Sequence, residues 1–293
     1  MAAASPYRLH EHGFWRSPPA GESRMLAALG LHLHCVVAGQ GEPPLVLLHG
    51  LGGSWDNWLP VIAPLSERRR LYAPDLPGCG RSPKPQAPYS VAWLAAVARD
   101  LLGREGALPA VLCGNSLGGH IALEYALRWP REVSALVLSA PAGGHRFPSL
   151  KASAMLTAAR LLGRGRLAAT LGPRVAPWFI RRLFHRCGPE CQEQAAFYQH
   201  YFRSPDCPLF LRAATRAASS HLRGGLLSRA HQLRMPALII AGRFDAAIPL
   251  AQVEGLARRI PRCRLAVFEC GHAPQLEEPG RFVAEVEGFL ASL

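Results

Sequence analysis

The chain has 293 residues, of which 49% are hydrophobic and 18% are charged, a balance typical of a globular protein with a substantial core. No apolar run reaches the roughly 20 residues that a membrane-spanning helix needs. Residues 1–25 carry charges and prolines where a signal peptide has its apolar core. We therefore expect a cytoplasmic protein, built as one large domain or as a domain with an insertion.

The net charge of +13 is concentrated in one segment. Residues 145–234 contain fifteen Arg or Lys and three Asp or Glu, and nearly all of the positive charge is arginine. Three interpretations are open: a GC-rich coding bias, attraction of an anionic substrate, and contact with an anionic membrane surface. No helix-turn-helix, RNA-binding or finger pattern accompanies the charge, so we expect a small-molecule partner and no nucleic acid. The oligomeric state is left open.

The eight cysteines form no C-x-x-C pair, and several lie in apolar, strand-like runs. In such runs a free cysteine behaves as a small hydrophobic residue. We expect neither a disulfide framework nor a zinc site, and no metal or cofactor.

Short apolar runs alternate with helical patterns along most of the chain. Strands are predicted at 31–38, 45–48, 71–74, 109–113 and 135–138, with helices at 90–104 and 119–129. The alternation resumes with strands at 237–241 and 264–268 and a last helix at 279–291. This order indicates an α/β fold, with a mostly parallel sheet flanked by helices.

The alternation is interrupted between residues 145 and 233, where no buried strand is predicted. Helical patterns cover 149–163, 175–186, 190–201 and 208–222 in this interval. We predict an inserted helical cap at 145–233, which divides the core into a first part at 1–144 and a second part at 234–293.

Ser116 is the candidate nucleophile. It is the central residue of Gly114-Asn115-Ser116-Leu117-Gly118, a G-x-S-x-G pattern between a predicted strand and a predicted helix. In this context the serine lies on a strained turn that exposes its hydroxyl above the sheet. The flanking glycines permit the crowded backbone.

A serine hydroxyl needs a base, and the base needs a group that orients it. Functional groups in α/β sheets gather at the carboxyl ends of strands. Asp245 follows the strand at 237–241 and His272 follows the strand at 264–268. The order Ser116, Asp245, His272 is the one that accompanies the G-x-S-x-G turn.

Two alternatives concern the acid. Asp245 is also a candidate helix cap or turn residue, because aspartate favours both positions. Asp75 follows a strand too, but it lies upstream of Ser116 in a Gly/Pro-rich loop. We interpret Asp75 as a residue that shapes this loop.

Acyl transfer also needs backbone N–H groups that stabilise an oxyanion. Leu117, the residue after the nucleophile, is the first predicted donor. Leu51 is the preferred second donor, with Gly52 as the alternative, because both lie in the glycine-rich loop after the strand at 45–48. The glycines of this loop, Gly50 and Gly52, allow the backbone to approach the substrate closely and are predicted to contact it.

These motifs together resemble the α/β-hydrolase fold superfamily, over 31–144 and 234–293. The resemblance implies a serine hydrolase. Serine at position 116 argues against the members that dehalogenate alkanes or open epoxides with an aspartate nucleophile. The matching stretches are 49–53, 75–82, 114–119, 242–249 and 271–272.

The stretches 114–120, 128–130 and 270–272 are also similar to the carbon–carbon hydrolases of aromatic degradation, which cleave vinylogous diketones. This resemblance implies that Asn115 contacts the substrate and that a cap arginine binds the substrate carboxylate. The chain differs after His272, where Ala273-Pro274-Gln275 stands in place of the usual tryptophan.

Three functions are therefore considered. The preferred one is a carboxylic-ester hydrolase acting on a small or medium acyl ester. A carbon–carbon bond hydrolase with the same three residues is the alternative. A binding protein on a hydrolase scaffold is the third, although such proteins typically lose one of the three residues.

Overall fold

An eight-stranded sheet forms the centre of the computed structural model, with the strand order β1-β2-β4-β3-β5-β6-β7-β8. The structure describes residues 17–143, 174, 177–178, 180–186, 188–203, 209, 212–217 and 226–293. β2 is antiparallel to both of its neighbours, and the remaining pairs are parallel. The strands are β1 (Glu22–Ala28), β2 (Leu31–Ala38), β3 (Leu45–Leu48), β4 (Leu71–Pro74), β5 (Ala110–Asn115), β6 (Val133–Ser139), β7 (Ala237–Gly242) and β8 (Cys263–Phe268).

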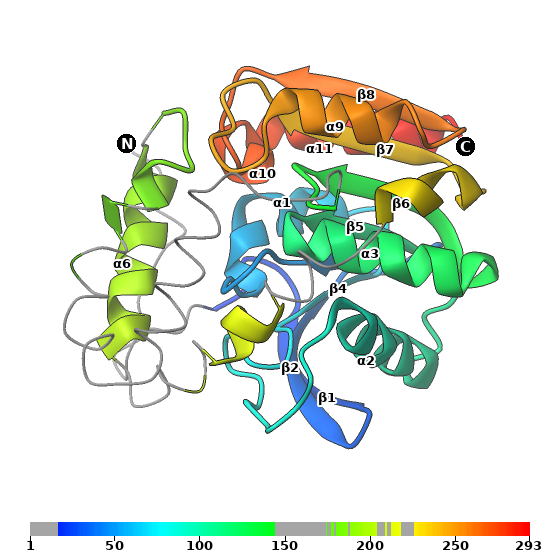
Figure 1. Ribbon diagram of the computed structural model, residues 1–293. Coiled ribbons are helices and arrows are strands. Elements are labelled where there is room, and N and C mark those ends of the chain that lie inside the picture. The colour runs from blue at the N-terminus through cyan, green and yellow to red at the C-terminus, as the bar shows by residue number, and fades with distance from the viewer. Residues whose placement is uncertain are drawn as a thin grey trace.

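Helices cover both faces of this sheet (Figure 1). One apolar core lies under α2 (Val91–Arg104), α3 (Leu117–Arg128) and α9 (Leu250–Ala257). A second core lies under α1 (Leu59–Ser66) and α11 (Pro279–Ala291). The short elements are η1 (Trp55–Trp58), η2 (Pro130–Glu132), α8 (Leu226–Arg229), η3 (Ala230–Gln232) and α10 (Pro274–Glu277).

The two-sided cover explains why the central strands are recognisable in the sequence. Every residue of β3 and β5 is buried, as expected for strands with helices on both faces. The predicted α/β-hydrolase fold is confirmed.

Among the described elements of seven or more residues, one strand and two helices were not predicted from the sequence. β1 pairs with β2 over its whole length and forms the edge of the sheet, so the strand predicted at 31–38 is the second from the edge. Most of β1 is exposed or half-buried, which removes the apolar signal of a strand. α1 contains Pro64, and α9 contains Gly255, and both residue types weaken a helical pattern.

The predicted cap is described only in part. The helix predicted over 190–201 is confirmed by α6 (Pro189–Arg203), which stands apart from the sheet at the left of Figure 1. Residues 212–217 are also helical, whereas the helix predicted over 149–163 lies outside the described residues. The boundaries at 145 and 233 remain predictions.

One cysteine departs from expectation. Cys191, on α6, is fully buried and disulfide-bonded, so the expectation of no disulfide is wrong at this position. Pairing of cysteines depends on which side chains meet in space, and sequence spacing does not report it.

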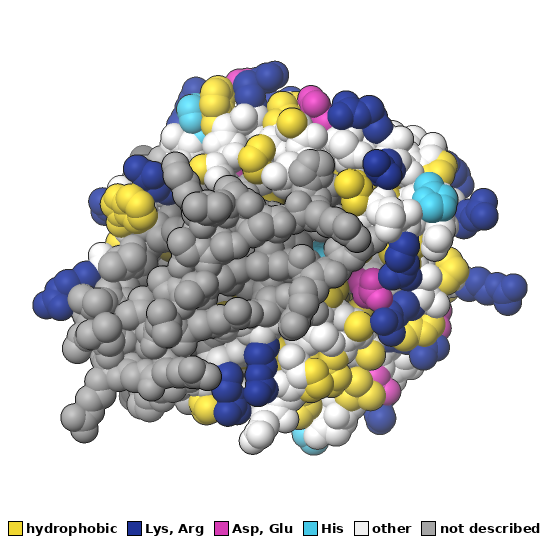
Figure 2. Space-filling model, in the orientation of Figure 1, with side chains coloured by type: hydrophobic (Ala, Val, Ile, Leu, Met, Phe, Trp, Pro, Cys, Tyr) yellow, Lys and Arg dark blue, Asp and Glu magenta, His cyan; other side chains and the backbone are white. Residues whose placement is uncertain are grey.

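Basic side chains are spread over the described part of the face in Figure 2. In the predicted cap, Arg174, Arg181, Arg182 and Arg186 are exposed. No helix in the described portion of the chain is long and apolar enough to cross a membrane. Contact with an anionic membrane surface remains a prediction.

The crossing of α3 over the sheet is tight because glycine occupies two positions. A β-carbon on Gly118 would collide with the carbonyl oxygen of Leu48 in β3. A β-carbon on Gly114 would collide with the backbone of Gly118 itself. The absence of side chains lets the start of α3 approach the carboxyl ends of β3 and β5.

Gly118→Ala is expected to destabilise the fold by about 3 kcal/mol, since backbone must move to admit the methyl group. Gly288→Ala, in the exposed part of α11 where a β-carbon meets nothing, should stabilise it by about 0.5–1 kcal/mol. Urea unfolding of both variants measures the difference. Equal effects of the two substitutions would contradict the close crossing.

Candidate active site

Ser116 lies on a sharp turn between β5 and α3. Its φ of +52° and ψ of −112° place a non-glycine residue in a strained region of backbone space. The backbone holds the turn: Ser116 N–H donates to Ser139 O at 3.0 Å, and Ser116 O accepts from Ala142 N at 3.0 Å. Such a geometry is typical of a nucleophile raised above a sheet edge.

Asp245 follows β7, and its carboxylate makes two kinds of contact. Oδ1 accepts hydrogen bonds from the backbone N–H groups of Ala247 and Ile248, at 2.7 and 2.8 Å. Oδ2 lies 2.7 Å from Nδ1 of His272. Asp245 therefore stabilises its own turn and is also paired with the predicted base.

His272 is fixed by its ring and by its backbone. Because Nδ1 faces a carboxylate, it carries the proton of the neutral ring and Nε2 is left as the acceptor. Burial disfavours the charged ring, but the carboxylate of Asp245 and, more weakly, that of Glu277 outweigh burial, so the pKa of His272 is raised. The His272 N–H donates to Leu183 O at 2.6 Å.

Ser116 and His272 line the same cavity, which has a volume of about 210 Å³. The sheet edge supplies one side, and Ile180, Leu183 and Phe184 of the predicted cap, with Gln194 on α6, supply the other. The described lining is mainly apolar, with four neutral amides. The lining residues are Gly50, Leu51, Asn57, Asn115, Ser116, Ile180, Leu183, Phe184, Gln194, Ala247, His272, Ala273, Gln275 and Leu276.

The glycine-rich loop reaches the same cavity. A β-carbon on Gly50 would lie 3.1 Å from Asn115 Oδ1 and 3.4 Å from Ser116 Cβ. Leu51 lines the cavity and is 41% exposed. Gly52, with a φ of +73°, lies instead beside a smaller apolar recess next to Leu117.

Asn115 is in the cavity wall, and its amide group is engaged by the backbone. Nδ2 donates to Ser139 O at 3.1 Å and to His272 O at 3.2 Å. The side chain therefore ties the end of β6 to the loop of the predicted base. Its predicted contact with substrate would come from the remaining oxygen.

Several residues at the site carry no signal in the sequence. Gln275 is buried and its Oε1 accepts from Ser139 Oγ at 2.8 Å. Asn57 on η1 donates to Gln194 on α6 at 3.0 Å, which joins the core to the predicted cap. Single amides belong to no motif, so only the fold brings them to the cavity.

His49 is buried, and its ring bonds to the backbone of Gly50 and of Leu76. Its Nε2 accepts from Leu76 N–H at 2.9 Å, so Nδ1 carries the proton and donates to Gly50 O at 2.8 Å. Burial lowers the pKa of His49, which keeps the ring neutral at physiological pH. Gly50 O also accepts from Gly53 N–H at 3.1 Å, which shapes the turn.

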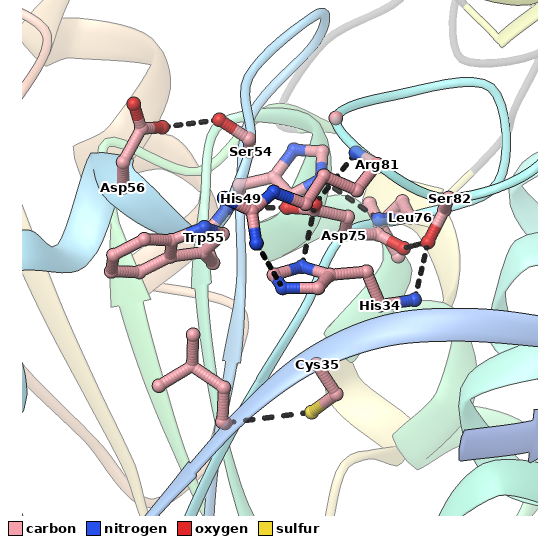
Figure 3. A network of polar contacts seen from close by, with 12 residues as sticks. His34, Cys35, His49, Ser54, Trp55, Asp56, Asp75, Leu76, Arg81 and Ser82 are labelled. Atoms are coloured by element: carbon pink, nitrogen blue, oxygen red, sulfur yellow. Dashed lines mark hydrogen bonds and ion pairs between the residues drawn. The ribbon is translucent and has the colours of Figure 1, made fainter. Parts of the chain in front are cut away.

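Asp75, the rival acid, is fully buried in a separate polar network (Figure 3). Oδ1 accepts from Trp55 N–H at 2.8 Å, and Oδ2 accepts from Arg81 N–H at 2.9 Å. Oδ2 is also 2.9 Å from His34 Nδ1. The carboxylate thus joins the chain around 54–55 to the loop at 75–82, as its interpretation as a loop-shaping residue predicts.

The thiols near the site are poor nucleophiles. Burial, with a contribution from the charge of Asp75, raises the pKa of Cys79 to about 12. Burial also raises the pKa of Cys270. Both thiols are protonated at neutral pH and so react slowly. Within the described ranges, no three His, Cys, Asp or Glu side chains are grouped as metal ligands.

Comparison with known proteins identifies the family. Residues 45–286 match the model of the alpha/beta hydrolase family, and the chain belongs to it. It is 34% identical over 291 residues to 2-hydroxymuconate semialdehyde hydrolase of Pseudomonas sp. strain CF600, covering 94% of this chain and 95% of that one. It is 33% identical over 265 residues to a pimeloyl-(acyl-carrier protein) methyl ester esterase of Nitrosomonas europaea, covering 86% and 97%.

A solved structure agrees with this assignment. A meta-cleavage product hydrolase from Pseudomonas fluorescens IP01 matches with a TM-score of 0.76 and 25% identity, covering 93% of this chain and 98% of that one. Each of these relatives is named as a hydrolase or an esterase, so hydrolysis is their shared class of reaction. Both predicted resemblances are confirmed, to the superfamily and to the carbon–carbon hydrolases.

Asp75→Ala should destabilise the protein by about 3 kcal/mol, because it leaves the buried N–H of Trp55 and the partly buried N–H of Arg81 without their acceptor. Glu254→Ala removes a carboxylate from an exposed pair with Arg258 and should change stability by less than about 1 kcal/mol. Urea unfolding checks both values. A similar small change in both variants would contradict the structural role of Asp75.

Proposed function

We propose that the protein is a serine hydrolase that cleaves carboxylic esters with small or medium acyl groups. Ser116 is the nucleophile, His272 the general base and acid, and Asp245 the group that orients His272. The observation that carries this proposal is the convergence of a strained serine turn and a carboxylate-paired histidine on one cavity.

The first half of the reaction forms an acyl-enzyme. Ser116 Oγ bonds to the acyl carbon while its proton passes to Nε2 of His272. Asp245 holds Nδ1–H and stabilises the positive charge that the ring acquires. His272 then gives the proton to the departing alkoxide as the ester C–O bond breaks, and an alcohol leaves.

The second half returns the enzyme to its starting state. Water attacks the acyl carbon, and its proton passes to His272. The bond to Ser116 Oγ then breaks, and the serine takes the proton back. One ester and one water yield one alcohol and one carboxylic acid, with no cofactor in the balance.

Two backbone N–H groups are proposed to stabilise the oxyanion. That of Leu117 lies in the first turn of α3, where N–H groups have no partner within the helix. For Leu51, the trans peptide with Gly50 directs the N–H away from Gly50 O, which faces the ring of His49. Leu51 is preferred over Gly52 because Leu51 lines the cavity that contains Ser116, whereas Gly52 lines only the smaller recess.

The cavity supports the choice of a small or medium neutral ester. Its volume of about 210 Å³ lies below the roughly 300–1,000 Å³ usual for sites that hold drug-sized ligands. Its described walls combine apolar side chains with amides. The esterase of Nitrosomonas europaea supports ester cleavage within this family.

Carbon–carbon bond hydrolysis is the second candidate. The similarity to 2-hydroxymuconate semialdehyde hydrolase over nearly the whole chain supports it. Asn115, in the cavity wall, stands where the resemblance implies a residue that contacts the substrate. This candidate also predicts that an arginine of the cap binds the carboxylate of the substrate, which must be tested by a functional assay.

The two reactions are separated by a spectrophotometric assay with a series of p-nitrophenyl esters beside a ring-cleavage dienoate. We expect ester turnover to be greatest for short acyl chains. Ser116→Ala should lower kcat roughly 10⁴- to 10⁶-fold on either substrate. Ser292→Ala, at the exposed end of the chain, is the matched control.

Rapid turnover of the dienoate with negligible ester hydrolysis would replace the first candidate by the second. A binding protein on the same scaffold would show neither activity. Failure of a serine-reactive phosphonate to label Ser116 in folded protein would support that third reading.

The pH dependence follows from the raised pKa of His272. Only the neutral ring accepts a proton, so kcat/KM should fall about tenfold per pH unit below that pKa. Asp245→Asn removes the charge that raises the pKa, so the acidic limb should move to lower pH, while kcat falls roughly 10⁴-fold. Rate profiles between pH 4 and 9 measure both effects. An unmoved acidic limb would argue against His272 as the titrating base.

A further inference from the structure

A short segment of the predicted cap is hydrogen-bonded to the loop that carries His272. We call residues 183–186 the latch segment. The Leu183 carbonyl oxygen accepts from the N–H of His272 at 2.6 Å. A β-carbon on Gly271 would collide with the same oxygen, so glycine is needed where the two chains meet. The cap therefore touches the backbone of the predicted base itself.

Glu277, on α10, holds both sides of this contact with one carboxylate. Oε1 accepts from Gly271 N–H at 2.9 Å and from Ala273 N–H at 3.4 Å, which lie on either side of His272. Oε2 accepts from His185 N–H at 2.8 Å and from Arg186 N–H at 3.4 Å. Each oxygen thus serves a different chain segment.

The latch segment also reaches the loop that carries the predicted acid. The ring of His185 stacks on the ring of Phe244, with centroids 3.9 Å apart and planes 16° apart. Phe244 directly precedes Asp245 in the chain. The segment is therefore in contact with the loops of both members of the Asp245–His272 pair.

Two residues of the latch segment also form part of the cavity wall. Leu183 and Phe184 line the cavity, while the following two backbone N–H groups are bound by Glu277. A substrate that packs against this wall presses on the segment that the carboxylate ties to His272.

We propose that Glu277 is a positioning residue that couples the cap wall to the catalytic base. This inference rests on the proposed function. Glu277 does not touch the cavity's substrate space; it acts through the backbone of residues 271–273. When substrate packs against the cap wall, the bonds to Glu277 keep Nε2 of His272 directed toward Ser116. Loss of the Glu277 carboxylate removes this link between the cap wall and His272.

The pKa of His272 offers a second way to detect this role, because it depends on the charges around the ring. Asp245, from the turn after β7, and Glu277, from α10, both favour the charged ring, and burial opposes it. His185 and Arg186 of the latch segment contact Glu277 through their backbone N–H groups. Replacing Glu277 by a neutral residue should therefore lower the pKa of His272 as well as loosen its loop.

The main test compares Glu277→Gln with Glu278→Gln. Glutamine keeps the size of the side chain but has one acceptor oxygen, so it satisfies only one of the two segments. We expect kcat on a short p-nitrophenyl ester to fall roughly 10- to 100-fold, as small misplacements of catalytic groups do, with little change in KM. The acidic limb of kcat/KM should move to lower pH. Glu278 pairs with Arg281 at the surface, and its variant should keep wild-type kinetics.

A double-mutant cycle tests the coupling itself. His185→Ala removes the stacking on Phe244 but keeps the backbone N–H. If the latch acts as one unit, the combined variant should lose less than the product of the two single losses. If the fold-loss in kcat of the double variant equals the product of the two single fold-losses, the proposed coupling is overturned. If Glu277→Gln does not fold, His185→Ala alone decides: a lowered kcat supports the proposal, and wild-type kinetics overturn it.

A measurement without turnover separates this proposal from the proposed function. The low-field proton resonance of His272 Nδ1–H should broaden or vanish in Glu277→Gln and persist in Glu278→Gln. If the wild-type protein hydrolyses no ester, the proposed function fails, and this resonance still tests the positioning. An unchanged resonance, kcat and acidic limb in Glu277→Gln would overturn the inference, as would equal losses in both variants.

Discussion

The close crossing of α3 over the ends of β3 and β5 is the constraint on which the site depends. Gly118 has no room for a β-carbon beside Leu48, and Gly114 has none beside Gly118. The chain must therefore reverse within one residue, and that residue is Ser116, at a φ of +52°. Strain at this position is sustained by the packing on both sides of it, since the surrounding core is rigid.

The loops around this turn are assembled by side chains that bind backbone groups. Asn115 donates to two carbonyl oxygens, and the carboxylates of Asp245 and Glu277 accept from backbone N–H groups. Asp75 does the same for the backbone N–H of Trp55, just after the glycine-rich loop in the chain. The bonds to the carboxylates are strong in a partly buried setting because the acceptor is charged and water competes with it less. These bonds fix the backbone of the loops, as backbone hydrogen bonds fix the backbone of helices and strands.

How much of this was visible in the sequence differs from residue to residue. Ser116, Asp245 and His272 were predictable because each follows a buried apolar run, and parallel strands bring their carboxyl ends to one edge. β1 was not, because its stability comes from pairing with β2 and its side chains are largely exposed. Gln275, Asn57 and Glu277 were missed because a single amide or carboxylate has no pattern until the fold gives it neighbours.

The sequence by itself determined the fold family, the alternation of most strands with helices along the chain and the three residues proposed for catalysis, since these depend on local periodicity and short motifs. Only the tertiary structure decided that Asp75 serves a separate network, that Asn115 holds two loops together, and that the latch segment lies against His272. These are contacts between residues far apart in the chain. Their partners are chosen by packing, and packing leaves no trace in the spacing of residues along a single sequence.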